Sequence, residues 1–310
     1  MIKKKILIFL GIVVFVIFLI SFFFPLFNNK NGILKNIMQS NSSPKEQNLK
    51  NTSQELHKIY ERNLNVLDPK VQAQGLIAEV LDSQDFLYKK NIYTIWPLAS
   101  LTKLITATVV LENIKNIDQV PITITTSTQN IEDGSGKLIT GEIYKASDLL
   151  KIMLMASSNR AAESFKEYFG QEKFLNLAKS TISKIGMTQT VIYDASGLDD
   201  RNTGTPFDTL LLLKYILENY PQILTWTRIS NLSFQPLNST RINVIQNINP
   251  LNERADFLGG KTGTSPLAKE NLAAVLQFKN LKLGIVIMGS QNRFSDLDTI
   301  LNWIDKAYQF

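Results

Sequence analysis

The sequence predicts a mixed α/β domain (class α+β). One β-sheet is built from both ends of the domain, and a helical part is inserted between them. Short apolar runs typical of strands occur at 75–91 and again at 271–289, and the sequence between them mostly has helical apolar spacing. Because strands need partners, the two distant runs are expected to share a sheet. A separate apolar run at 6–27 is long enough to form one transmembrane helix ahead of this domain.

The N-terminal part of the chain divides into three predicted segments. Residues 1–5 contain three consecutive lysines, so the positive-inside rule predicts that they form a cytoplasmic stub. The chain after Phe27 is then expected on the outer side of the cell membrane. The run at 6–27 has no small-residue exit, which favours a retained single-pass signal-anchor over a cleaved signal peptide. Residues 28–70 are rich in Asn, Ser and Lys and predict a flexible tether with a short amphipathic helix at 52–64. A single folded domain is then expected at 71–310.

Composition excludes several kinds of chemistry. The 310 residues include no cysteine and one histidine, His57, on the polar side of the predicted tether helix. Cysteine nucleophiles, lipid attachment through cysteine and zinc sites built from imidazoles are therefore excluded, and no metal or cofactor is expected. The net charge of +6 is spread along the chain without a basic stripe, so nucleic acid is not expected as a partner.

The expected elements follow the apolar spacing along the domain. Two strands at 75–82 and 86–91 form a hairpin around Asp82–Asp85, and 99–114 is helical. The later elements are two helical runs within 146–170 joined near Ser157–Asn159, a helix at 208–220, strands at 271–278 and 281–289, and a closing helix at 294–308.

A serine and a lysine lie one turn apart at the start of the helix at 99–114. Positions i and i+3 share a helix face, so the amine of Lys103 can reach the hydroxyl of Ser100. His57 lies in the tether and is a poor partner for a Ser-His-Asp triad, which leaves lysine as the candidate base. A lysine acts as a base only when neutral, and burial near other cations lowers its pKa. A second S-x-x-K, Ser42–Lys45, falls in the tether and indicates how common this motif is.

Two further motifs follow in the chain. An S-x-N occurs at Ser157–Asn159, at the junction of two helical runs, and a K-T-G occurs at Lys261–Gly263, beside the strand at 271–278. Each motif alone is weak, since Ser290–Asn292 is another S-x-N and such residues often cap helices. The ordered set of all three in these contexts is typical of penicillin-binding proteins and serine β-lactamases.

The likeness extends beyond the three motifs. From about Gln74 onward the chain resembles the low-molecular-weight D-alanyl-D-alanine carboxypeptidases of serine peptidase family S11 in four segments. These segments are PLASLTKLITATVVLE, GEIYKASDLLKIMLMASSNRAAE, KIGMTQTVIYDASGLDDRNTGTPFD and FLGGKTGT. The resemblance implies the β-lactamase/transpeptidase-like fold, an antiparallel sheet covered by helices with an inserted all-helical subdomain. It places the active site in the cleft between these two parts.

The resemblance also implies a catalytic role for four residues. Ser100 would attack the carbonyl between two D-alanines of a peptidoglycan stem peptide, and Lys103 would accept its proton. Ser157 would relay a proton toward the leaving amine, and Asn159 would hold the substrate amide and help to orient Lys103. β-Lactams would acylate the same serine and inhibit the enzyme.

Substrate binding would fall to the K-T-G segment. The family pattern implies that Lys261 keeps the site positive and that the hydroxyls of Thr262 and Thr264 lie where the terminal carboxylate binds. The backbone N–H groups of Ser100 and Thr264 would form the oxyanion hole. Gly263 has no Cβ, so the strand can approach the acyl-enzyme closely.

Two places depart from the family pattern. Arg160 follows the S-x-N motif where the family more often has an acidic residue, which predicts altered packing around this turn or a contact with an anionic part of the substrate. The segment Thr264–Lys269 replaces the aromatic residue and Ala-Gly pair that usually follow K-T-G, which bears on substrate preference rather than on chemistry.

Three other functions stay open beside a membrane-anchored serine-type D-Ala-D-Ala carboxypeptidase. A D,D-endopeptidase of the same family, cutting peptidoglycan cross-links, would use the same residues. A class A-like β-lactamase needs a glutamate for deacylation, and Glu172–Asn176 fits its E-x-x-L-N pattern. However, this segment lies in a helical run soon after Ser157, so Glu172 is expected to be solvated. An inactive peptidoglycan-binding scaffold is disfavoured by the intact motifs.

Overall fold

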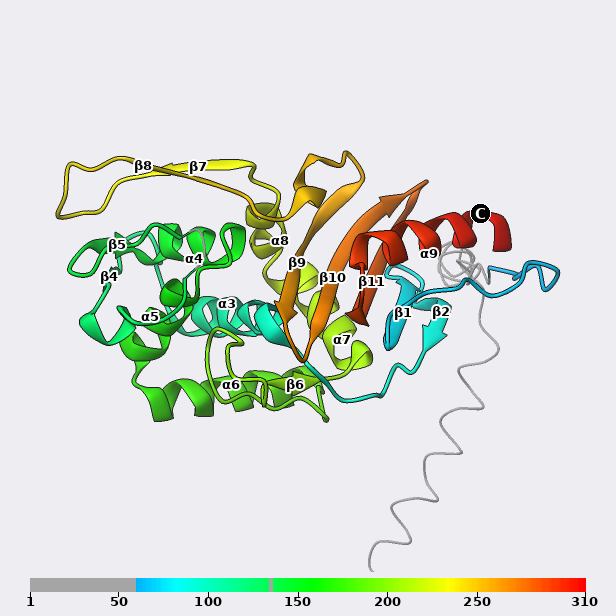
Figure 1. Cartoon of the computed structure of the whole chain (residues 1–310), viewed down its shortest axis with the longest axis horizontal. Helices are drawn as coiled ribbons and strands as arrows, with labels where there is room; N and C mark the ends of the chain where they lie inside the picture. Colours follow the sequence, from blue (N-terminus) through cyan, green and yellow to red (C-terminus); the bar gives the residue numbers. More distant parts are fainter. Residues whose placement is uncertain (1–59, 134–135) are drawn as a thin grey trace, which may run out of the picture. The chain divides into compact units, whose positions relative to one another are not determined.

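A five-stranded antiparallel sheet joins the two ends of the domain (Figure 1) in the computed structural model, which describes residues 60–133 and 136–310. Its strands are β1 (Gly75–Val80), β2 (Asp85–Lys90), β9 (Phe257–Ser265), β10 (Lys269–Phe278) and β11 (Leu281–Ser290). The order β2-β1-β11-β10-β9 pairs the first hairpin with the last strand, so that Gly75 lies opposite Met288. The predicted sheet between distant parts of the chain is therefore confirmed.

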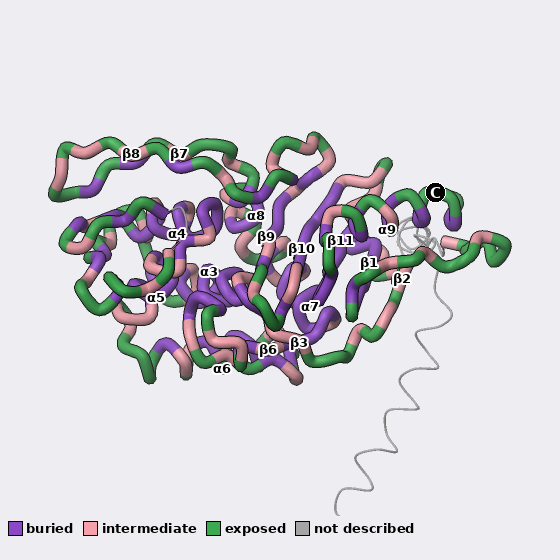
Figure 2. The backbone as a smooth tube through the Cα atoms, viewed as in Figure 1, coloured by how far each residue is buried: buried purple, intermediate pink, exposed green. Residues whose placement is uncertain are grey.

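The two faces of the sheet are covered by different helices. Leu76 and Ile287 are cross-strand partners and pack in one buried cluster with side chains of α9 (Arg293–Ala307). The next pair, Ile77 and Val286, packs in the other cluster, which includes side chains of α7 (Pro206–Asn219). This alternation follows from the period of two in a strand. Figure 2 shows buried backbone through the central strands β10 and β11 and through α3 (Thr102–Asn113).

The helical part is inserted between β2 and β9 and lies beside the β9 edge of the sheet (Figure 1). Besides α3 and α7, its helices are α4 (Ala146–Met155), α5 (Asn159–Phe169), α6 (Gln171–Ile185) and α8 (Gln222–Thr227). Short antiparallel pairs complete it: β3 (Trp96–Pro97) with β6 (Thr203–Gly204), β4 (Pro121–Thr123) with β5 (Ile143–Lys145), and β7 (Asn231–Phe234) with β8 (Asn243–Gln246). Its 3₁₀ turns are η1 (Ala99–Leu101), η2 (Thr126–Thr128) and η3 (Pro250–Glu253).

Local sequence explains where several helices begin and end. The hydroxyl of Ser158 accepts a hydrogen bond from Ala161 N at the start of α5. Pro206 occupies the first turn of α7, where its missing N–H costs nothing. Gly170 has a φ of 84° and separates α5 from α6, so the helical run that includes Glu172 is two helices rather than one.

The start of the packed unit differs from the sequence prediction. The described residues of the predicted tether helix, 60–64, are not helical; Arg62 instead forms a β-bridge with Tyr308. Trp303 Nε1 donates a 2.8 Å hydrogen bond to the carbonyl of Leu67. Contacts with the C-terminal end of the chain thus override the helical spacing, and residues 60–70 belong to the packed unit rather than to a free tether.

The remaining N-terminal predictions concern residues that the structure does not describe. The cytoplasmic stub at 1–5, the signal-anchor at 6–27, Ser42–Lys45 and His57 all lie outside the described residues. Within 60–133 and 136–310, none of the helices has the length and apolarity needed to cross a bilayer.

Candidate active site

Ser100 lies in the 3₁₀ turn η1, directly before the buried helix α3. The preceding residue, Ala99, has a φ of 47°, an uncommon conformation for a residue with a side chain. Gly197 packs against this turn so closely that a Cβ there would lie 1.9 Å from the carbonyl oxygen of Ala99. The turn places Lys103 Nζ 3.0 Å from Ser100 Oγ, as the i, i+3 spacing predicted.

Lys103 is completely buried, with 0 % of its surface exposed. Its Nζ donates 2.6 Å hydrogen bonds to Asn159 Oδ1 and to the carbonyl of Ser196. Burial lowers the pKa of Lys103 to about 7, because the charged ammonium loses its hydration. The amine is therefore neutral in a large fraction of molecules near neutral pH, which is the state in which it can accept a proton.

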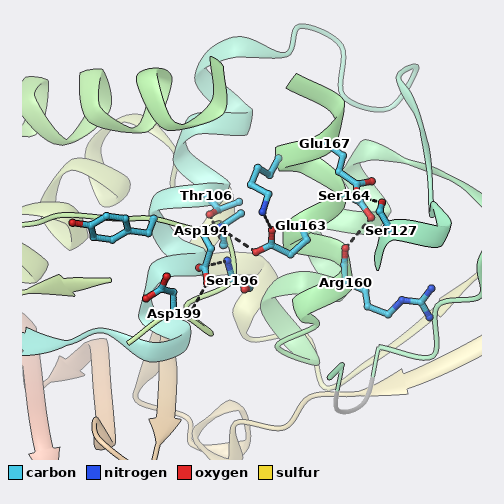
Figure 3. Close-up of polar contacts among 12 residues, drawn as sticks. Thr106, Ser127, Arg160, Glu163, Ser164, Glu167, Asp194, Ser196 and Asp199 are labelled. Atoms are coloured by element: carbon cyan, nitrogen blue, oxygen red, sulfur yellow. Dashed lines mark hydrogen bonds and ion pairs between the residues drawn. The ribbon is translucent and has the colours of Figure 1, made fainter. Parts of the chain in front are cut away.

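Three carboxylates oppose this effect by favouring the charged form of Lys103. They belong to Asp194, Glu163 and Asp133. Figure 3 shows Glu163 and Asp194 near Ser196 and Thr106. Glu163 accepts a 3.2 Å hydrogen bond from Ala195 N and pairs with Lys166, and Asp194 accepts from the backbone N–H of Ser196 at 3.0 Å.

The K-T-G residues lie within strand β9 itself, antiparallel to β10, with Lys261 opposite Ala273. Lys261 Nζ donates hydrogen bonds to Ser157 Oγ at 3.0 Å and to the carbonyl of Thr262 at 2.9 Å. Burial, together with the nearby cations Lys103 and Arg293, lowers the pKa of Lys261 well below its usual range. This lysine joins the strand to the S-x-N turn, in which Ser157 has a φ of 54°.

Gly263 brings β9 against the turn that carries the serine. A Cβ at this position would lie 2.9 Å from the carbonyl oxygen of Leu98 and 3.1 Å from Ser100 N, so a side chain has no room. The close approach of strand and nucleophile that was predicted from this glycine is present.

Arg293 is a residue of the site that sequence reasoning missed. The residue is 8 % exposed, and its guanidinium donates to Thr264 Oγ1 at 2.6 Å and to the carbonyl of Gly263 at 2.8 Å. It begins α9, about thirty residues after the K-T-G motif, and no spacing in the sequence connects the two. Only the packing of α9 across β10 and β11 brings this cation to the site.

A cleft opens above these buried groups. It is lined by Ser100, Glu132, Ala156, Ser157, Asn159, Gly197, Leu198, Asp200, Ile248, Thr262, Gly263, Thr264, Ser265 and Pro266. Six of the eight predicted site residues line the cleft, and Lys103 and Lys261 lie buried next to it. In the described part of the chain, no group of three or more His, Cys, Asp or Glu side chains is arranged to hold a metal ion.

Other sequence features fall outside this site. In Ser290–Asn292, the Ser290 hydroxyl donates to Asp296 and the Asn292 side chain caps α9, so this S-x-N is structural. Glu172 is exposed in the first turn of α6 and does not line the cleft. The segment after K-T-G contributes Ser265 and Pro266 to the lining of the cleft, and Ser265 Oγ donates a 2.7 Å hydrogen bond to Asp200, which also lines it.

The fold and the site together define a serine hydrolase with a buried lysine beside the serine. Residues 62–292 match the model of peptidase family S11, D-alanyl-D-alanine carboxypeptidase, and the chain belongs to this family.

Known proteins similar to this chain agree with that assignment. A D-alanyl-D-alanine endopeptidase of Haemophilus influenzae is 33 % identical over 64 % of this chain and 68 % of that protein. The D-alanyl-D-alanine carboxypeptidase DacC of Escherichia coli is 26 % identical over 76 % of this chain and 62 % of that protein. The crystal structure of a D-alanyl-D-alanine carboxypeptidase from Mycobacterium tuberculosis has the same fold, with a TM-score of 0.72, 22 % identity and coverage of 80 % of this chain and 98 % of that one.

Proposed function

We propose that this protein removes the terminal D-alanine of peptidoglycan stem peptides through an acyl-enzyme on Ser100. The observation that carries the proposal is the 3.0 Å contact between Ser100 Oγ and the buried amine of Lys103, whose pKa is about 7. A neutral amine at hydrogen-bond distance from a serine hydroxyl is suited to take its proton.

The proposed acylation step uses the groups that meet at the cleft. Ser100 Oγ attacks the carbonyl carbon between the two D-alanines while its proton passes to Lys103 Nζ. Lys103 is then an ammonium, and Asn159 Oδ1 and the carbonyl of Ser196 accept hydrogen bonds from it. The C–N bond breaks when the Lys103 ammonium gives up its extra proton, which passes through Ser157 Oγ to the leaving nitrogen, so that Lys103 is neutral again. D-alanine leaves, and the shortened peptide stays on Ser100 as an ester.

The proposed deacylation reverses the proton transfers with water as the nucleophile. Neutral Lys103 takes a proton from the water that attacks the ester carbonyl, and Ser100 leaves with a proton. Arg293 supplies a positive charge and Lys261 an N–H donor on the β9 side of the cleft, which suits the terminal carboxylate of the substrate. The hydroxyls of Thr262 and Thr264 complete the proposed carboxylate site.

A D,D-endopeptidase is the second candidate, because the relative from Haemophilus influenzae carries that name. Both reactions cleave an amide on the carboxyl side of a D-alanine, so the same residues would serve either one. The purified enzyme should be offered a D-Ala-D-Ala pentapeptide and a cross-linked stem-peptide dimer, and the products identified by mass spectrometry. Faster release of free D-alanine supports the carboxypeptidase, and faster conversion of dimer to monomers supports the endopeptidase.

The first test is covalent labelling of the full chain, purified in mild detergent, with a fluorescent penicillin. A stable adduct on the peptide that contains Ser100 is expected, and Ser100→Ala should remove it. Rapid release of hydrolysed drug would favour a β-lactamase. Neither adduct nor hydrolysis would favour a scaffold and would overturn the proposal.

We also propose that residues 6–27 anchor the enzyme in the cell membrane, with the catalytic domain on the extracytoplasmic side. The proposal is supported by the long apolar run and the three lysines ahead of it. Deleting residues 1–27 should release the protein from the membrane fraction. Retention of the shortened protein in that fraction would contradict a single anchor.

A further inference from the structure

The turn between α4 and α5 is bound to a neighbouring segment by three consecutive residues. We define the flanking segment as residues 131–133 and 136–140. Ser158 Oγ donates a 2.6 Å hydrogen bond to Asp133 Oδ1, and Arg160 N donates to the same oxygen at 2.7 Å. Between them, Asn159 Nδ2 donates a 2.6 Å hydrogen bond to the carbonyl of Glu132. The flanking segment therefore contacts the S-x-N turn at every residue from 158 to 160.

The contact with Glu132 fixes which way the carboxamide of Asn159 faces. A carboxamide has one accepting oxygen and one donating NH₂ group. Because Nδ2 is bound to the Glu132 carbonyl, Oδ1 faces Lys103 Nζ at 2.6 Å. A flipped carboxamide would place its oxygen against the carbonyl of Glu132 and its NH₂ group against the lysine amine. The position of one backbone carbonyl thus selects the orientation that serves the base.

Arg160 holds the other side of the flanking segment. Its guanidinium donates to the carbonyl of Leu138 at 2.7 Å and to Thr140 Oγ1 at 2.8 Å. The side chain does not line the cleft, so of the two roles predicted for this departure from the family pattern, altered packing agrees with the structure and a substrate contact does not.

Gly136 allows the flanking segment to lie directly on the turn. A Cβ at this position would lie 2.6 Å from Ser158 Oγ and 2.7 Å from Asp133 Oδ2. Such distances are too short for real atoms, so an added Cβ would have to displace the Ser158 and Asp133 side chains, which form the hydrogen bond between the segment and the turn. The flanking segment is therefore clamped onto the turn by hydrogen bonds that the Arg160 guanidinium donates and the Asp133 carboxyl group accepts, together with close packing at Gly136.

We propose that Arg160 and Asp133 are positioning residues, which orient the carboxamide of Asn159 toward Lys103 by clamping the flanking segment onto the S-x-N turn. Neither residue is assigned a contact with substrate. This inference rests on the proposed function, because it assumes that Lys103 activates Ser100.

The test is a double-mutant cycle on acylation of the full-length enzyme by a fluorescent penicillin. Arg160→Ala should slow acylation about tenfold or more, and Arg160→Lys, which keeps one donor group, should restore part of the rate. In the Asn159→Ala background, Arg160→Ala should change the rate by less than about twofold, because its effect passes through Asn159. If Arg160 only stabilised the fold, Arg160→Ala would lower the acylation rate by the same factor in the wild-type and Asn159→Ala backgrounds.

Arg254→Ala is the matched control. This substitution also removes side-chain hydrogen bonds of an arginine, here to Asp256 and Asp298, but Arg254 does not line the cleft. Its acylation rate should stay within about twofold of wild type. The inference is overturned by a wild-type rate in folded Arg160→Ala, or by equal losses in the two backgrounds. If Arg160→Ala does not fold, Arg160→Lys and Thr140→Val each remove part of the clamp, and wild-type rates in both would overturn it. No acylation of the wild-type enzyme would instead overturn the proposed function, and this inference with it.

Discussion

Lys103 Nζ lies 3.0 Å from Ser100 Oγ, with no exposed surface on the lysine. The distance follows from a 3₁₀ turn that leads into α3, and the burial follows from the packing of this helix at the centre of the helical part. The three hydrogen-bond acceptors of the amine are all neutral, since they are the Ser100 hydroxyl, the Asn159 carboxamide and the backbone carbonyl of Ser196. The site therefore holds an amine without a directly bonded carboxylate, which keeps its neutral form accessible.

The pH dependence of acylation should report this amine. The reactive form of Lys103 is neutral, so the second-order acylation rate constant should be low below the lysine pKa and rise to a plateau above it. With a pKa of about 7, the midpoint of the rise is expected near pH 7. Stopped-flow measurement with a fluorescent penicillin from about pH 5 to about pH 9 checks this expectation. A flat profile, or one that falls with pH over this range, would contradict a lysine base.

Removing the Glu163 carboxylate should move the midpoint of the pH profile of acylation to lower pH. Glu163 favours the charged ammonium, so Glu163→Gln is expected to lower the pKa of Lys103 further and to extend full acylation to more acidic solution. Glu167→Gln is the matched control, because this residue lies one turn later on α5 and its carboxylate binds Thr125 and Ser127 instead (Figure 3). Equal midpoints for the two variants would show that Glu163 does not act on the lysine.

The sequence was sufficient for most of the fold because apolar spacing and local caps determine it. Four of the five strands of the sheet, the helix after Ser100 and the closing helix were predicted near their observed bounds, whereas β9, which contains the K-T-G motif, was not predicted as a strand. The prediction failed at 60–64, where bonding to the C-terminal end of the chain replaces a helix. It also missed the break at Gly170 within the helical run that includes Glu172, where the positive φ of this glycine separates two helices.

The site was predictable only where its residues belong to short motifs. Ser100 and Lys103 are linked by helix geometry, and the other predicted residues were found through their order along the chain. Arg293 and Glu132 reach the site from a distant helix and from an irregular segment, so no local pattern identifies them. Arg160 was noticed as a departure, but its partners were visible only in the structure.

Arg293 should matter most for substrates that carry a terminal carboxylate. Its buried guanidinium does not line the cleft but binds Thr264 Oγ1 and the carbonyl of Gly263, two residues that do, so its positive charge lies next to the proposed carboxylate site. Arg293→Ala is expected to raise KM for a D-Ala-D-Ala peptide about tenfold and to change KM for the C-terminally amidated analogue much less. Steady-state kinetics on both peptides measure the difference. Similar losses on the two peptides would mean that Arg293 supports the strand rather than the carboxylate.

Gly263→Ala should slow acylation by moving β9 away from the nucleophile. The added Cβ would lie 2.9 Å from the carbonyl oxygen of Leu98 and 3.1 Å from Ser100 N, and both neighbours are backbone atoms that cannot rotate away. Overpacking of this kind costs about 1–3 kcal/mol in the free energy of unfolding. The acylation rate should fall about tenfold or more, because the strand and Ser100 N are displaced together. Gly170→Ala is the control: its φ of 84° also strains an alanine, but no atom lies within 4 Å of the new Cβ. This control should lose about 1 kcal/mol of stability at a wild-type acylation rate. If both variants were destabilised equally and both were acylated at the wild-type rate, the contact between β9 and the serine turn would have no part in catalysis.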